Sequence, residues 1–132
     1  MKKVLALIVL TCMLCGCSST KVVKDNKMPL DFTVVTKKDI PTELFTIIEE
    51  KQTEEFTMSY TLDGYLYIAV GYGKQDTGGY SIQVEELYET ESNIGINTTL
   101  VGPQAGEAVN KMATYPYVVV KTEYIDKNII FE

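Results

Sequence analysis

The side chains that could do chemistry in this sequence are carboxylates, lysines and a short cluster of cysteines. The 132 residues contain no histidine and no arginine, which excludes imidazole metal ligands, Ser-His-Asp or Cys-His catalysis and arginine forks for phosphate. The densest acidic group is Glu85, Glu86, Glu89 and Glu91. It lacks the spacing and the glycine of an EF-hand calcium loop, so it favours a solvated acidic face. Nothing places two carboxylates in a pocket for acid–base work, so we expect no enzyme activity, no cofactor and no metal.

The net charge narrows the class of partner. At pH 7 the formal net charge is −6, from 12 lysines against 18 aspartates and glutamates. Affinity for nucleic acid comes mainly from neutralising phosphates with Lys and Arg. The charge balance therefore argues against a nucleic-acid partner.

The first segment has the composition of a secretory leader. Two lysines precede an apolar run at residues 4–10, which is too short to span a bilayer, since a span needs about 20 residues. Residues 14–17 (LCGC) resemble a bacterial lipobox, which implies cleavage before Cys17 and lipid on that cysteine. We therefore expect a signal peptide at residues 1–16 and a lipid anchor on the extracytoplasmic face of the cell membrane. The alternative is an ordinary secreted protein with an incidental thiol.

The mature chain is expected to be one tethered domain. All three cysteines lie within residues 12–17, so no disulfide can form beyond them and the domain folds on its core alone. Residues 17–28 comprise the lipidated cysteine and a polar tether, whose lysines either lie near anionic headgroups or are simply solvated. Residues 29–132 are enough for a single domain and not for two.

Sequence periodicity predicts an α+β fold. Apolar residues at helical spacing indicate one N-terminal helix near residues 40–52, with Asp39 as its cap and Pro41 in its first turn. The rest of the folded part alternates at the period of a strand. It predicts a mainly antiparallel sheet of about six strands, either open or curled toward a barrel or sandwich, at residues 32–36, 56–62, 65–72, 80–84, 94–100 and 117–125.

Two details of these strands follow from single residues. Asp63-Gly64 separates two strand runs and is typical of a type I′ hairpin turn, in which both central residues need positive φ. The run after it is apolar on both faces, which predicts a central strand with the helix across one side. Glu85-Glu86 breaks the alternation of its strand and indicates a bulge or a strand end.

Two connections contain the candidate partner-binding residues. One is the glycine-rich loop at residues 73–79, and the other is the segment 102–112, which continues to Tyr117. A connection as long as the second is usually functional or flexible in a compact domain. On the hypothesis that both lie at one end of the sheet, they form one contact surface. Its candidate residues are Asp76, Thr77, Gly78, Gly79, Tyr80, Pro103, Tyr115, Pro116 and Tyr117.

A structural role competes with a binding role at these positions. Gly78-Gly79 either makes a turn or supports a rigid loop tip that presents its neighbours to a partner. Pro116 marks a strand start or an edge, and its flanking tyrosines either cover the sheet end or form an aromatic anchor. Stacking of the nine tyrosines on wall sugars is a further alternative, although strand propensity and cross-strand packing explain their alternation better.

Four segments together resemble the C-terminal domain of the protease complex subunit PrcB family. They are Gly73, the run TGGYSI from Thr77, Gly102-Pro103 and the run TYPYVVVK from Thr114, and the resemblance covers about residues 65–121. It implies a non-catalytic surface lipoprotein, because the family's namesake accompanies a surface subtilisin-like protease and supports its assembly or stability. The function implied here is a protein-binding module, an accessory or stabilising subunit of a protease complex.

Two other functions remain open from the sequence. One is a lipoprotein that binds glycans or the cell wall. The other is a cysteine protease inhibitor, because residues 76–80 (DTGGY) look similar to the inhibitory loop of chagasin-type proteins. The Asn-Pro, Trp and Arg-Pro-Trp elements of that family are missing. The three functions predict different ligands: a surface protease, the wall, or a papain-like protease.

Overall fold

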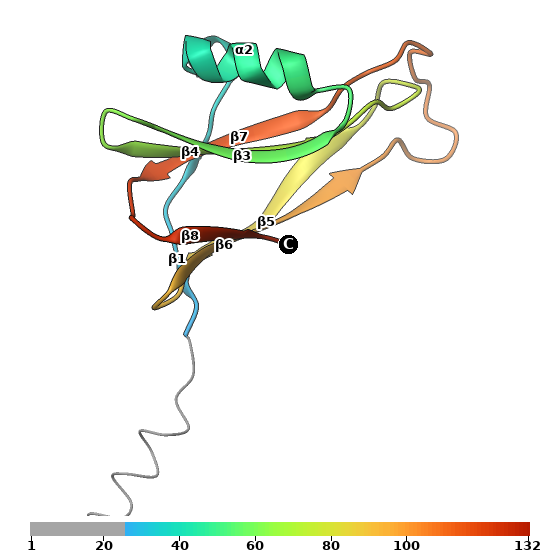
Figure 1. The fold of residues 1–132 in the computed structure, drawn as a ribbon. Helices are drawn as coiled ribbons and strands as arrows, with labels where there is room; N and C mark the ends of the chain where they lie inside the picture. The colour runs from blue at the N-terminus through green and yellow to red at the C-terminus, as the bar shows by residue number, and fades with distance from the viewer. Residues whose placement is uncertain (1–25) are drawn as a thin grey trace, which may run out of the picture.

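In the computed structural model, which describes residues 26–132, strands form two sheets that pack face to face (Figure 1). The first sheet has the order β1-β5-β6-β8 and the second the order β2-β7-β4-β3. Every pairing is antiparallel except that of β6 with β8. The strands are β1 (Met28–Pro29), β2 (Thr33–Val34), β3 (Glu55–Leu62), β4 (Tyr65–Tyr72), β5 (Ser81–Glu89), β6 (Asn93–Val101), β7 (Tyr117–Glu123) and β8 (Asn128–Phe131).

Strand β4 organises the core because both of its faces are buried. On one face Ile68 and its neighbours pack against the first sheet, and on the other face Tyr67 and Ala69 pack under helix α2 (Thr42–Lys51). Figure 1 shows the helix lying across the outer side of the second sheet. Full burial of one aliphatic side chain stabilises a fold by roughly 1.5–3 kcal/mol, so these two clusters hold the three layers together. The prediction of a central strand covered by the helix is confirmed.

The predicted hairpin and bulge are also present. Asp63 and Gly64 have φ values of 52° and 81°, as a type I′ turn requires. The register between β5 and β6 shifts between Val84 and Glu86, so the interruption at Glu85-Glu86 is a bulge, and β5 continues beyond it to Glu89.

Within residues 26–132 the structure has eight strands, more than the predicted six or so. In this range the two sheets form a sandwich and not a closed barrel. Strands β1 and β8 were missed, and the strand expected at 32–36 is present only as the two-residue β2. Strand β1 has two residues and β8 has four, which is too short for a strand period to be recognised. The last predicted strand, 117–125, ends at Glu123, because the chain then turns and Lys127 N–H donates to Ile125 O at 3.0 Å.

The start of the helix also differs from the prediction. Pro41 has an extended backbone with ψ 137°, so it is the N-cap residue and the helix begins after it, at Thr42. Asp39 does not cap the helix. It lies in a preceding 3₁₀ turn, η1 (Lys37–Asp39), where its carboxylate accepts a hydrogen bond from Thr36 Oγ1 at 3.1 Å. The helix ends at Lys51, close to the expected end.

The expected leader and anchor lie outside the described residues. These are the signal peptide at 1–16, Cys17 and most of the tether. At the end of the expected tether, Met28 pairs with Glu89 in β1, so the domain begins there. Within residues 26–132, no helix has the length and apolar character that a membrane crossing needs.

Candidate functional site

The two connections singled out in the sequence pack against each other beyond the end of the second sheet. Gln75 and Thr114 exchange two backbone hydrogen bonds of 2.8 and 3.0 Å, and Thr114 Oγ1 donates to Thr77 O at 2.7 Å. Gly78 N–H donates to Asn110 O at 2.8 Å. We call residues 73–80 and 102–116 the joined loops. Figure 1 shows them together at one end of the molecule.

Glycine is favoured where the joined loops touch. Gly79 has a φ of 87°, and a Cβ there would lie 3.0 Å from Val109 Cγ1 and 3.1 Å from Pro103 Cβ. Gly102 lies directly beside the ring of Tyr80, where a Cβ would be 3.1 Å from Tyr80 Cε1. The contacts of Gly79 support its structural role as a turn residue, and they show that the two loops are closely packed.

The structure places the remaining candidates in two groups. Asp76 is exposed on the joined loops, and Tyr115 and Pro116 are half-buried at their end, where Pro116 O accepts from Tyr72 N–H at 3.1 Å. Tyr117 belongs to β7 and packs against the cluster under the helix. Burial, with a smaller contribution from Glu49, raises the pKa of Tyr117. Tyr117 is therefore a packing residue rather than part of the loop surface.

Sequence reasoning missed the exposed apolar side chains of this region. Met112 is 66% exposed and Val101, just before the second loop, is 42% exposed. The signal was present, because Met112 is a large apolar residue in an otherwise polar and small-residue connection. A partner could bury both without first reorganising the loops.

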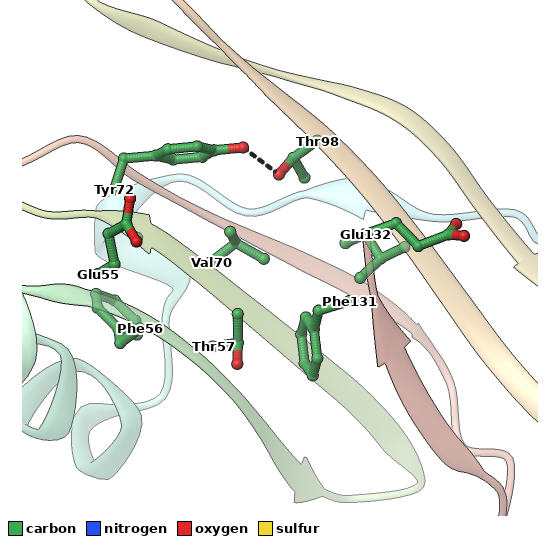
Figure 2. A pocket seen from close by; sticks show the side chains of 10 residues that line it. Glu55, Phe56, Thr57, Val70, Tyr72, Thr98, Phe131 and Glu132 are labelled. Carbon is green, nitrogen blue, oxygen red and sulfur yellow. Dashed lines mark hydrogen bonds between the residues drawn. The ribbon is translucent and has the colours of Figure 1, made fainter.

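A second feature is a pocket between the two sheets at the edge formed by β3 and β8 (Figure 2). We call it the edge pocket; its volume is about 330 Å³. Tyr72 Oη and Thr98 Oγ1 lie 2.6 Å apart and hydrogen-bond across it, joining one sheet to the other. It is lined by Glu55, Phe56, Thr57, Val70, Gly71, Tyr72, Ile96, Thr98, Phe131 and Glu132.

The carboxylate of Glu132 is engaged on the outer face of the first sheet. Tyr88 Oη donates to Glu132 Oε1 at 3.0 Å, and the ammonium of Lys27 lies 4.4 Å from the centre of the Tyr88 ring. The hydrogen bond to Glu132, followed by burial, raises the pKa of Tyr88. Figure 2 shows this carboxylate pointing away from the edge pocket while the aromatic ring of Phe131 borders it.

The acidic stretch and the tyrosines have structural partners. Glu89 pairs with Lys127 at 2.8 Å, and Glu86 lies 3.5 Å from Lys27. No group of acidic residues in the described part of the chain is arranged to hold a metal ion. Tyr60 and Tyr67 pack across strands with ring centres 6.5 Å apart, as the cross-strand explanation predicts.

Residues 66–123 match the PrcB C-terminal family model. The resemblance predicted from the sequence at about residues 65–121 is thereby confirmed. The PrcB C-terminal match runs from β4 to the end of β7 and contains both joined loops. It supplies the lining residues of the edge pocket on β4 and β6, while those on β3 and at the end of the chain from Phe131 lie outside the match. No curated protein and no solved structure matches the chain.

Proposed function

We propose that this chain is a non-catalytic accessory subunit of a protease complex and that it binds its protein partner through the joined loops. The observation that carries the proposal is the PrcB C-terminal match, which spans both loops and the strands that hold them. That family relates the chain to protease complexes.

The chemistry of the joined loops supports a binding role. Their hydrogen bonds fix the backbone on both sides of Thr114, while Met112 stays exposed nearby. Binding through a segment that is already ordered avoids much of the entropy cost of arranging a loop on contact. Methionine is adaptable and polarisable, and it is common on surfaces that bind proteins.

We also propose that the domain is held at the extracytoplasmic face of the cell membrane by lipid on Cys17. The support is the lipobox-like motif at residues 14–17. Cys17→Ser should move the chain from the membrane fraction to the soluble fraction of lysed cells. Persistence of the variant in the membrane fraction, with loss only after a salt wash, would contradict the lipid anchor.

Site-specific crosslinking in living cells tests the binding role. A photoreactive amino acid replaces Met112 in the full chain, and the matched control replaces Val34, which is 54% exposed on β2 away from the joined loops. We expect position 112 to yield one recurrent adduct, identified by mass spectrometry as a protease, and position 34 to yield none. An adduct with a papain-like protease that the chain inhibits would favour the inhibitor instead. Retention on wall sacculi without a protein adduct would favour glycan binding and contradict the proposal.

A further inference from the structure

Strand β6 is only partly covered on one of its two sides. It pairs with β5 over its whole length, but β8 pairs with it only from Asn93 to Ile96. In residues 26–132, no strand lies beside residues 97–101 on that second side. We call residues 97–101 the open edge.

The backbone geometry shows which groups the open edge offers. Ile96 O accepts a hydrogen bond from Glu132 N–H at 2.9 Å, so the backbone groups of Ile96 point toward β8. The backbone N–H and C=O groups of successive residues point to alternate sides of a strand. Thr98 and Leu100 therefore direct these groups to the same side as Ile96 does. These groups form a template for one more strand, beginning where β8 ends.

The edge pocket lies beside the open edge. Thr98 lines the pocket, and the aromatic rings of Tyr72 and Phe131 border it together with Val70 (Figure 2). A strand placed beside residues 97–101 directs alternate side chains toward the space between the sheets. An apolar side chain of such a strand would therefore enter the edge pocket.

The charge around the edge pocket favours a partner segment with a basic residue. Among the pocket's lining residues, Glu55 has its carboxylate at the pocket, the carboxylate of Glu132 points away toward Tyr88, and there is no lysine. Glu55 is exposed at the rim of the pocket. A segment with a basic residue next to its apolar anchor matches this arrangement, and an acidic segment is repelled.

We propose that the open edge binds an extended segment of a partner protein by strand addition, with an apolar side chain in the edge pocket and a basic residue beside Glu55. This inference rests on the proposed protein-binding function and adds a binding mode to it. In strand addition, main-chain hydrogen bonds provide affinity and side-chain pockets provide specificity. The open edge has both features side by side.

The outer edge of β3 is one competing place for an added strand. The hairpin pairing makes Leu62 and Tyr65 partners next to the turn, so Ser59 and Thr61 direct their backbone groups outward. The side chains of β3 that face the space between the sheets are Glu55, Thr57, Ser59 and Thr61, all polar and exposed. This edge lacks an apolar pocket along most of its length, so the open edge of β6 is the stronger template.

Defined peptides test the binding mode without a known partner. The probe is an acetylated, amidated heptapeptide, Lys-Thr-Val-Thr-Val-Thr-Lys, titrated into the full isotope-labelled chain in mild detergent and followed by amide chemical shifts. We expect saturable shifts at residues 97–101 and in the pocket lining. N-methylation of the peptide amides that face β6 should weaken binding about tenfold or more, the equivalent of losing about 1.4 kcal/mol. Replacing both lysines by glutamate should also weaken it, and added salt should reduce that difference.

Paired variants separate the two edges. Leu100→Pro removes an outward N–H of β6 without removing a bond to β5, and Ser59→Pro is the matched change on β3. Leu100→Pro should abolish the peptide shifts, whereas Ser59→Pro should leave them unchanged. Thr57→Phe should block the pocket, and Thr61→Phe, farther along the same strand, is its control. If Leu100→Pro does not fold, the N-methylated peptide gives the same test in the unaltered chain.

The outcomes distinguish this inference from the proposed function. Peptide shifts confined to β3, or equal binding of the N-methylated peptide, overturn strand addition at the open edge. A protease captured at position 112, with residues 97–101 unmoved by any peptide, overturns only the binding mode. Shifts at residues 97–101 without any captured protease support strand addition and contradict the protease role.

Discussion

The two edges of the sandwich differ in how the chain closes them. At the β1–β2 edge, the chain itself crosses from one sheet to the other, and Leu30 N–H donates to Leu87 O at 2.9 Å. The crossing is fixed further where Thr122 Oγ1 donates to Asp31 O at 2.8 Å. At the β3–β8 edge the chain crosses at one end, through residues 124–127 between β7 and β8, and the edge pocket lies between the sheets farther along.

The difference is the basis of the proposed strand addition at the open edge. Backbone groups of β5 from Leu87 to Glu89 are used by the chain's own crossing at the closed edge, while those of Thr98 and Leu100 remain directed outward at the other edge. Natural sheets usually protect such an edge by covering it or by keeping it short. Short β8 covers only part of β6, and the uncovered part lies beside an apolar pocket.

The largest expected effect comes from the core that both edges share. Ile68 is fully buried between the sheets, with 0% exposure. Ile68→Ala should lower the free energy of unfolding by about 3 kcal/mol, because it removes buried methyl groups and leaves a cavity. Denaturant unfolding measures this loss. The control Ile130→Ala, at a residue 43% exposed on β8, should change it by less than about 0.5 kcal/mol. A loss below about 1 kcal/mol for Ile68→Ala would contradict tight packing of the sheets.

A smaller effect is expected at the closed edge. Thr122 is buried, and its hydroxyl holds the crossing through Asp31 O. Thr122→Val keeps the shape but removes the donor, so the free energy of unfolding should fall by about 1.5 kcal/mol. The amides of Leu30 and Val35 should then exchange faster with solvent. Unchanged exchange at both amides would show that the hydroxyl does not secure the crossing.

The matching change at the β3–β8 edge should lower the free energy of unfolding by less. Tyr72→Phe removes the hydrogen bond to Thr98 Oγ1, but the pocket is open and water can replace the lost hydroxyl. We expect a loss of about 0.5 kcal/mol, measured by denaturant unfolding. A loss larger than that of Thr122→Val would mean that this hydrogen bond closes the β3–β8 edge as firmly as the chain closes the other.

The smallest expected effect appears only at alkaline pH. The hydrogen bond to Glu132 raises the pKa of Tyr88 above its ordinary value of 10.0. Above that value the unfolded chain releases a proton that the folded chain keeps, so the free energy of unfolding falls as pH rises through the folded pKa. Below pH 10 the contribution is fully present. Tyr88→Phe and Glu132→Gln should both flatten this alkaline fall in pH-dependent unfolding. An unchanged slope in both variants would show that the bond does not stabilise the fold.

Local sequence predicted the features that depend on neighbouring residues. The Asp63-Gly64 turn, the bulge near Glu85-Glu86 and the apolar β4 all depend on a few adjacent side chains, and all three are present. The cap was misassigned because Asp39 forms a hydrogen bond within its own 3₁₀ turn, and the extended backbone of Pro41 separates that turn from the helix.

Features that depend on distant pairing could not be predicted from the sequence. Strand β1 forms only because β5, far along the chain, lies beside it, and β8 forms by a parallel pairing with β6 that no local pattern encodes. The edge pocket brings β3, β4, β6 and β8 together, so its lining has no sequence motif. The joined loops were identified by glycine content and family resemblance, but the bonds between Gln75 and Thr114 became visible only in the fold.

Residue-resolved amide hydrogen exchange of the free full chain tests the contrast between the edges most directly. The amides of Leu30 and Val35 donate to Leu87 O and Val119 O, so we predict slow exchange at the closed edge. The amides of Thr98 and Leu100 should exchange much faster, although their neighbour Thr99 is paired with Gln83 in the same strand. Protection of Thr98 and Leu100 as strong as that of Val35 would show that the open edge is covered, and would contradict the account.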